Sequence, residues 1–301
     1  MPMTDTNAAT DDSAPPLQTS PPARRWSRRR FLLNSVLATM GTGVAALGYS
    51  AIEAGWVGIV RQQVAIPRLP TGWIGGTIVQ LTDIHHGKLV SLGYIGSVVD
   101  AVNALQPDVI CLTGDYVSRG GELVDPCLDL LGCLRPRVGI FAVPGNHDYY
   151  QDVRLFYQAV ERNSMVNLTN RGEWAVRNGS RLRIAGVDDL WHGQPNFDGL
   201  REMQPDDAGA ILLSHNPDFV EQNPADPRVG LVLSGHTHGG QLCLPIYGAP
   251  VVPSRYGQKY VHGLVQGPLS QVYVSRGVGT VAIPLRFGAP PEITVIELTR
   301  A

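Results

Sequence analysis

The sequence has little charge for its length. Charged residues make up 17% of the 301 residues, and the net charge at pH 7 is −2. The basic residues form no stripe outside the N-terminal region, so the usual electrostatic footprint of a nucleic-acid-binding protein is missing, and we expect no nucleic-acid partner. Hydrophobic residues make up 44% of the chain. This content is typical of a globular protein with a sizeable core, in one large domain or two ordinary ones.

Cysteine is also scarce. The four cysteines are Cys111, Cys127, Cys133 and Cys243, and none belongs to a Cys-x-x-Cys pair of the kind that binds metals. Cys111 lies in the apolar run DVICLTGD, which we expect to be buried, so free thiols are favoured. Cys127 and Cys133 are the one pair close enough in sequence to be worth testing as a disulfide.

The first part of the chain has almost nothing to bury. Residues 1–23 are rich in Thr, Asp, Ser, Ala and Pro, a composition typical of disorder.

Residues 24–54 begin with an arginine cluster and continue with the uncharged stretch Phe31–Ile52, which is the order of a signal segment. Within it, Ser27–Leu32 resembles the twin-arginine export signal. We therefore expect residues 55–301 to form the functional domain.

Two fates of this leader stay open. The stretch 31–52 is long enough to span a bilayer, while the small residues at 44–46 and 49–51 are only mediocre cleavage sites. The leader is therefore either removed or kept as a membrane anchor. In both cases the twin-arginine export machinery is the expected partner, and the expected location is the periplasm or cell envelope.

From about Thr77 onward, short branched apolar runs alternate with longer amphipathic stretches, which predicts an α/β protein with strands buried on both faces. Residues 93–108 have helical spacing, and Pro107 is expected to end that helix. The predicted strand runs are TIVQLTD, DVICLTGD, GIFAVPGN, LRIAGVDD, AILLSHN, GLVLSGH, QVYVSRG and EITVIEL.

Five of these runs end in side chains that bind metals. The residues concerned are Asp83, His85, Asp115, Asn146, His147, Asp148, His215, His236 and His238. They include five of the eight histidines of the chain; His86, His192 and His262 lie outside the proposed ligand set. Because ligands of α/β sheets bind at the carboxyl ends of the strands, these side chains should converge. Imidazole, carboxylate and amide donors without thiolate suit Mn, Fe, Co, Zn or Ni.

The order of these motifs, Asp-x-His, Gly-Asp, Gly-Asn-His-Asp, a lone His and Gly-His-x-His, resembles the calcineurin-like metallophosphoesterase superfamily over roughly residues 57–300. The leader, LTDIHHG and PLRFGAPPEITVIEL are similar to its small exported bacterial branch, of the YkuE and YaeI type. The resemblance implies a four-layer αββα sandwich, with two mixed sheets face to face and the metals at the sheet edge.

The resemblance also implies a two-metal site with one shared carboxylate. Its ligand sets would be Asp83, His85 and His238 for one ion, Asn146, His215 and His236 for the other, and Asp115 as the bridge. Two divalent or trivalent transition-metal ions (Mn, Fe, Zn or Co) would then supply a bridging hydroxide as the nucleophile and bind the phosphoryl oxygens.

His147 is expected to act on the substrate, as a charge stabiliser or a proton donor, with Asp148 orienting or charging it. Many members of the superfamily read Gly-Asp-x-x-Asp-Arg, whereas this chain has Ser118 in place of the second Asp and keeps Arg119. The Asp that partners the catalytic His in those members is therefore missing from this chain. Arg119 and His86 are the expected contacts to substrate.

The activity implied by the resemblance is hydrolysis of phosphoesters outside the cytoplasm, with phosphodiesters favoured over monoesters. One alternative is a pyrophosphatase or phosphodiesterase that lies against a membrane and acts on lipid-linked substrates. The other alternative is an inactive scaffold that uses the same fold for binding and holds no stoichiometric metal.

Overall fold

A computed structural model of the chain describes residues 27–222 and 226–301. The chain forms two units, one that ends at Ala45 and one that begins at Ala46. The described part of the first unit lies in helix α1 (Arg28–Glu53), which is long and apolar enough to cross a membrane by length and composition. The disorder predicted for residues 1–23 lies outside the described residues.

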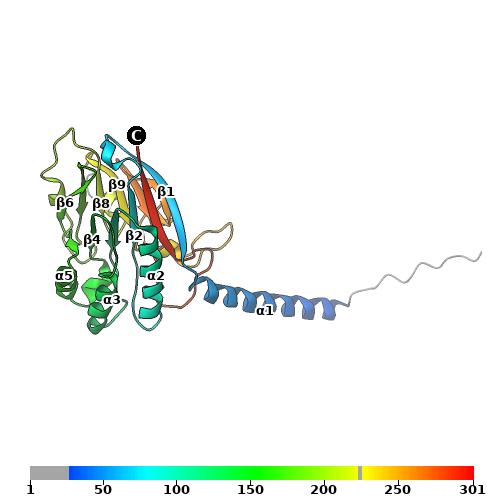
Figure 1. Cartoon of the computed structure of the whole chain (residues 1–301). Helices are drawn as coiled ribbons and strands as arrows, with labels where there is room; N and C mark the ends of the chain where they lie inside the picture. The colour runs from blue at the N-terminus through cyan, green and yellow to red at the C-terminus, as the bar shows by residue number, and fades with distance from the viewer. Residues whose placement is uncertain (1–26, 223–225) are drawn as a thin grey trace, which may run out of the picture. The chain divides into compact units, whose positions relative to one another are not determined.

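The second unit contains two six-stranded sheets (Figure 1). In the first sheet all neighbours are parallel except β12 and β2. Its order is β1 (Gly58–Ile66), β12 (Glu292–Arg300), β2 (Thr77–Leu81), β3 (Val109–Thr113), β4 (Gly139–Val143) and β5 (Val166–Asn167). Leu81, at the end of β2, pairs with Leu112 of β3, and the next residue of β3, Thr113, pairs with Val143 at the end of β4. The three strands therefore end almost in line.

The second sheet has a parallel centre and an antiparallel strand at each edge. Its order is β10 (Gly263–Gln266), β11 (Gln271–Val274), β9 (Val229–Ser234), β8 (Ala210–Leu213), β7 (Ser180–Gly186) and β6 (Arg171–Arg177). Leu213 pairs with Leu233 and Ser234 with Val274, so this sheet also brings several carboxyl ends to one edge.

Three apolar layers hold the unit together. The first lies between the first sheet and helices α2 (Leu92–Leu105), α3 (Val124–Leu131) and α5 (Val153–Arg162), which gather on one side in Figure 1. The second lies between the sheets, where side chains such as Phe141, Leu213 and Leu233 are buried. The third covers the outer face of the second sheet.

The predicted architecture of two mixed sheets with helices outside is confirmed. The outermost layer over the second sheet is thin, because its described helices are the four-residue α6 (Phe219–Gln222) and the short 3-10 helices η3 (Asp198–Leu200) and η5 (Gly257–Tyr260). Loops cover the rest of the outer face of the second sheet, and one of them carries aromatic residues that lie at the functional site.

Every predicted strand run contains a strand, and the predicted helix is α2, which ends at Leu105, with Gln106 as its C-cap before Pro107. The sequence pattern missed β1, β5, β6 and β10. All four are edge strands whose residues are mostly exposed or half-buried, so they lack the continuous apolar run that marked the central strands. All four cysteines are free, with Cys111 and Cys127 buried and Cys133 exposed.

Candidate metal centre

The predicted ligands follow the carboxyl ends of five strands, from both sheets. Asp83 follows β2 and Asp115 follows β3, whereas Asn146 follows β4 at the start of α4 (Asn146–Tyr150). His215 follows β8 and His236 follows β9. The parallel pairing within each sheet brings these ends to one edge of the sandwich, so residues far apart in sequence meet there.

The backbone at these positions is unusual. Five of the seven predicted ligands have positive φ angles between 50° and 70°: Asp83, His85, Asp115, His236 and His238. The left-handed region disfavours non-glycine residues by roughly 1–2 kcal/mol each. The surrounding sheets therefore hold the ligands in conformations that the isolated chain would avoid.

Two glycines allow the close approach of these turns. A Cβ atom on Gly114, whose φ is 92°, would lie 2.6 Å from the amide nitrogen of Gly145. A Cβ atom on Gly235 would lie 2.2 Å from a carboxylate oxygen of Asp83. The glycines next to Asp115 and His236 are thus required for packing at the centre.

The first predicted ligand set is assembled. His85 Nε2 lies 3.0 Å from His238 Nε2 and 3.5 Å from Asp115 Oδ2. Asp83 Oδ1 lies 3.2 Å from His238 Nε2 and 3.9 Å from His85 Nε2. The other contacts of the Asp83 carboxylate are the backbone N–H of His236 and the hydroxyl of Thr82, which donate to it and fix its direction.

The second set surrounds His215. Its Nε2 atom lies 3.2 Å from Asn146 Oδ1, 3.2 Å from His236 Nδ1 and 3.3 Å from Asp115 Oδ2. The Nδ1 atom lies 2.7 Å from the carbonyl oxygen of Thr113, which fixes the proton on Nδ1 and leaves Nε2 for the centre. Asp115 Oδ2 faces both sets, as a bridging carboxylate must.

These spacings fit bound cations. Ligand atoms about 2.0–2.2 Å from one ion lie roughly 2.8–3.6 Å apart along the edges of a tetrahedral or octahedral shell. The donor distances above fall in that range, apart from the 3.9 Å between Asp83 Oδ1 and His85 Nε2. The residues Asp83, His85 and His238, and likewise Asp83, Asp115 and His215, form groups that could hold a metal ion.

The electrostatics of the centre favour neutral imidazoles at three positions. Burial lowers the pKa of His85 and of His236 to about 3. The pKa of His238 is well below its usual value because of burial first, then the nearby His85 imidazole and the Arg286 guanidinium. Neutral imidazole is the form that binds metals.

His215 behaves in the opposite way. Burial alone would lower its pKa, but the Asp115 carboxylate beside it raises that pKa to about 10. Burial would likewise raise the pKa of Asp115, yet the neighbouring His215 holds it well below its usual value. An ion that binds here must displace the proton of His215, so metal uptake releases a proton.

His147 lies at the edge of the same cluster. Its backbone N–H donates to Asp115 Oδ1 at 2.8 Å, and its Nδ1 atom lies 3.1 Å from the carbonyl oxygen of Ser118. The ring packs edge-on against His85 and Tyr150. His147 is half-buried and lines the pocket, and with His85 and Asp115 it forms a third group that could hold a metal ion.

Asp148 occupies a different place from the one predicted. Its buried carboxylate accepts hydrogen bonds from the backbone N–H groups of Asp115, Tyr116 and Gly145, at 2.8–3.0 Å. It therefore holds the loop after β3 against the loop after β4. The prediction was different, because it had Asp148 orienting the His147 imidazole. Burial and the Asp115 charge raise the pKa of Asp148 to about 7.

The two predicted substrate contacts do not line the pocket described next. His86 is buried, and its Nδ1 atom lies 2.9 Å from the carbonyl oxygen of Val90, which holds the loop after β2. Arg119 is exposed, in the loop after β3. Of the other two histidines outside the ligand set, His192 packs against Tyr149 and Tyr150 near the site.

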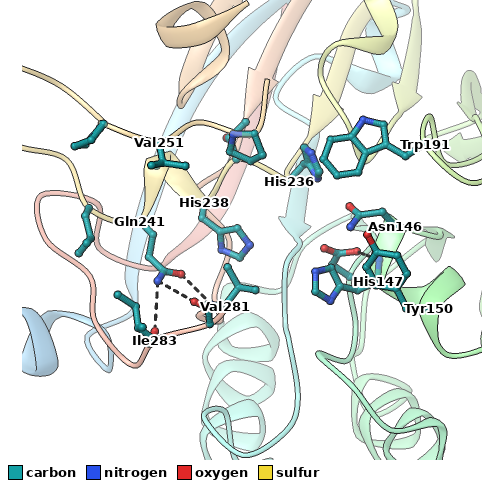
Figure 2. A pocket seen from close by; sticks show the side chains of 17 residues that line it. Asn146, His147, Tyr150, Trp191, His236, His238, Gln241, Val251, Val281 and Ile283 are labelled. Carbon is teal, nitrogen blue, oxygen red and sulfur yellow. Dashed lines mark hydrogen bonds between the residues drawn. The ribbon is translucent and has the colours of Figure 1, made fainter. Parts of the chain in front are cut away.

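A cavity of about 540 Å³ opens over the centre. Figure 2 shows His236, His238, Asn146 and His147 facing it, with Trp191 and Tyr150 on one side and Val251 and Ile283 on the other. Trp191 packs edge-on against His236 at 4.4 Å between ring centroids. The side formed by Leu242, Val251, Pro253, Val281 and Ile283 is called the apolar wall below.

Sequence reasoning missed Arg286. Its fully buried guanidinium donates to the carbonyl oxygens of Gly279, His238 and Ala289, and its Nη2 atom lies 3.4 Å from His238 Nδ1. Arg286 therefore joins the metal centre to the segment that carries part of the apolar wall. The signal in the sequence was an arginine within an otherwise uncharged stretch, VAIPLRFGAPP, which is an unusual place for a charge.

Residues 76–240 match the calcineurin-like phosphoesterase family. The chain belongs to this family. The matched region contains all seven predicted ligands and ends before the first residue of the apolar wall, so the family match covers the centre and leaves the wall outside it.

Relatives of known name match much more of the chain. The uncharacterized metallophosphoesterase YkuE of Bacillus subtilis (strain 168) is 32% identical over 283 residues, which cover 91% of this chain and 98% of that protein. The phosphodiesterase YaeI of Escherichia coli (strain K12) is 32% identical over 277 residues, covering 90% and 99%. The resemblance to both proteins noted from the motifs is confirmed.

A bovine transmembrane protein with a metallophosphoesterase domain is 31% identical over 290 residues, and this chain spans 64% of its length. Among solved structures, a 5′-nucleotidase precursor from Thermus thermophilus matches 68% of this chain and 49% of its own, with 15% identity and a TM-score of 0.42. The family assignment depends on the sequence matches.

Proposed function

We propose that this chain is a metal-dependent phosphodiesterase that holds two transition-metal ions and acts outside the cytoplasm. The observation that carries the proposal is the convergence of Asp83, His85 and His238 with Asn146, His215 and His236 on the two sides of Asp115, at distances of 3.0–3.9 Å between donor atoms. The name of the YaeI relative supports a diester substrate.

Bound ions of Mn, Fe, Zn or Co supply Lewis acidity and lower the pKa of water, so that hydroxide is available at neutral pH. The residues of the chain contribute position and charge. Asp115 balances charge between the two ligand sets, and Asn146 offers a neutral oxygen on the side of the pocket. His147, which faces the cavity (Figure 2), is placed to contact a phosphoryl or leaving-group oxygen and to give it a proton.

Asp148 acts through the backbone in this proposal. Because its carboxylate accepts from the amides of Asp115 and Gly145, it fixes the bridging ligand relative to the turn that leads to His147. It is a positioning residue, and its loss would displace two loops at once.

A second candidate is a phosphodiesterase or pyrophosphatase of lipid-linked substrates. The apolar wall favours it, because a purely polar substrate would leave Val251, Val281 and Ile283 without a partner in the cavity. Export is proposed from the twin-arginine motif at Ser27–Leu32, and attachment to the membrane from α1.

Metal analysis and hydrolysis together test the proposal. The full chain, purified with α1, should contain about two transition-metal ions and hydrolyse bis-p-nitrophenyl phosphate faster than the monoester. His236→Ala should lose activity and metal, while His262→Ala, outside the cluster, serves as the matched control. Protein that stays free of metal and inert after Mn, Fe, Zn or Co is supplied would favour an inactive scaffold.

A further inference from the structure

Two segments at the mouth of the cavity lack charge although much of their surface is exposed. Residues 242–253 read LCLPIYGAPVVP and residues 277–285 read GVGTVAIPL, without one charged side chain. We call them the rim segments. Ile246 is fully exposed, Tyr247 is 73% exposed and Val251 is 75% exposed. Contiguous exposed apolar residues of this kind mark an interaction surface.

Residues next to the rim segments bind the two segments together. The backbone N–H of Cys243 donates at 2.6 Å to the carbonyl oxygen of Phe287, which lies two residues after the second segment. The side chain of Gln241, the residue before the first segment, exchanges hydrogen bonds with the backbone of Val281 and also donates to the carbonyl oxygen of Ile283. Figure 2 shows the bonds of Gln241 to Val281 and Ile283 beside the pocket. The two segments therefore form one surface.

The same surface is fastened to the last turns of α1. The backbone N–H of Arg286 donates to the carbonyl oxygen of Ser50, and Tyr49 packs edge-on against Phe287. The buried carboxylate of Glu53 accepts from the N–H groups of Ala289 at 2.8 Å and Gly288 at 3.2 Å. All of these residues belong to the unit that begins at Ala46.

Glu53 lies at the end of α1, and this position favours a lipid surface as the partner of the rim segments. The uncharged stretch Phe31–Ile52 is about 33 Å long at 1.5 Å per residue, close to the roughly 30 Å hydrocarbon core of a bilayer. A helix of this length places Glu53 at the lipid–water boundary. Whatever is hydrogen-bonded to Glu53 must lie near that boundary as well.

Two further features agree with a lipid partner. Tyr247 and Trp56 are exposed aromatic residues, the types enriched at membrane interfaces. In addition, residues 227–291 contain no Asp or Glu, so this part of the chain offers no negative charge to repel anionic head groups.

We propose that the rim segments, led by Ile246 and Tyr247, dock on the surface of the bilayer that holds α1, so that the cavity opens at the lipid–water boundary. The contact itself does not require hydrolysis. Its consequence for substrates rests on the proposed function: the site would take phosphodiesters or pyrophosphates whose apolar part comes from the membrane and lies against the apolar wall.

The direct test measures the depth of Ile246. The full chain is reconstituted into vesicles of phosphatidylethanolamine and phosphatidylglycerol, in a Cys133→Ser, Cys243→Ala background that keeps the buried Cys111 and Cys127. Ile246→Cys carries an environment-sensitive NBD fluorophore. Val176→Cys, on β6 and 58% exposed, is the matched control.

Lipids that carry a nitroxide near the head group should quench the fluorophore at position 246 by at least about half, as expected for a side chain within the interface, and leave position 176 almost unchanged. Equal, weak quenching at both positions overturns the proposal. A blue-shifted emission at 246 without quenching by lipid nitroxides also overturns it, and assigns the surface to a second copy of the chain.

A second variant separates docking from chemistry. The double substitution Ile246→Glu and Tyr247→Glu should lower hydrolysis of a vesicle-embedded phosphodiester by about tenfold, because the carboxylates oppose contact with the anionic surface. Hydrolysis of soluble bis-p-nitrophenyl phosphate should stay unchanged, since neither residue lines the cavity. An equal loss on both substrates contradicts docking.

The two proposals fail in different ways. If the parent chain hydrolyses neither diester while position 246 is quenched, the proposed function is wrong and the docking surface stands. If soluble hydrolysis is normal while position 246 is not quenched, the function stands and docking is wrong.

Discussion

The metal centre and the apolar wall are two parts of one cavity with opposite composition. The centre consists of buried imidazoles and carboxylates, each of which follows a strand of one of the two sheets. The wall comes from segments without charge that belong to long connections between β9 and β10 and between β11 and β12. On the proposed function, this comparison teaches that the strand ends supply the reacting groups, while the connections select the substrates that reach them.

Removing the bridging carboxylate should break the centre most completely. Asp115→Asn keeps the shape of the side chain but removes the charge that faces both ligand sets. We expect kcat/KM for bis-p-nitrophenyl phosphate to fall by at least about 10³-fold, the upper end of what one preorganised charged or polar group contributes. Steady-state kinetics and elemental analysis measure the effect, with Asp198→Asn, at a half-buried residue paired with Arg201, as control. Wild-type rate and metal content in Asp115→Asn would contradict the bridging role.

Arg286 tests the connection between centre and wall. Arg286→Met removes the donors to the carbonyl oxygens of His238, Gly279 and Ala289. We expect metal affinity to fall by about 10–100-fold, which is the usual loss when the hydrogen-bond partner of a metal-ligating side chain is removed. A metal titration followed by activity measures this, with circular dichroism to verify folding. Arg137→Met, at a surface ion pair, is the control; equal affinities in the two variants would show that Arg286 does not position His238.

The apolar wall should affect selectivity and leave the metals in place. In Val251→Ala with Ile283→Ala, the ratio of kcat/KM for an octyl phosphodiester to that for the methyl analogue should fall about tenfold, because each removed methylene contact contributes roughly 1–3 kcal/mol at most. Val176→Ala serves as control. A ratio that does not change, or a loss of metal, would place the substrate elsewhere in the cavity.

The smallest effect is expected at the end of α1. Glu53→Ala leaves the N–H groups of Gly288 and Ala289 without their acceptor, which should cost about 1–3 kcal/mol of unfolding free energy. Thermal unfolding in detergent should show a lower Tm, by about 2–4 °C per kcal/mol. Glu53→Gln keeps an acceptor oxygen and should lose less. Equal Tm values for all three proteins would mean that the tie contributes nothing to stability.

The sequence indicated which side chains would lie together at the centre because the signals for them are local. Each ligand stands directly after a buried apolar run, so the strand and its terminal side chain could be read together, as at Leu213 and His215. The structure brings the residues together, and the ligand roles stay a proposal until metal is measured. The predicted pairing of Asp148 with His147 differs from the structure because the nearest donors to its carboxylate are backbone amides, which no sequence pattern specifies.

The wall and its fastening could not be predicted in the same way. Exposed apolar loops have no period, and Arg286 and Glu53 act on backbone groups far from them in sequence. The edge strand β1 was missed because its exposed and half-buried residues alternate. In each case the contact that determines the structure joins residues that are far apart in sequence. The features that could be predicted are patterns within a few neighbouring residues.

The left-handed backbone at Asp83, His85, Asp115, His236 and His238 has a consequence for the evolution of this chain. At such positions glycine or asparagine relieves conformational strain, so an inert descendant that exchanged its ligands for these residues could gain heat resistance. Thermal selection alone would therefore erode this centre.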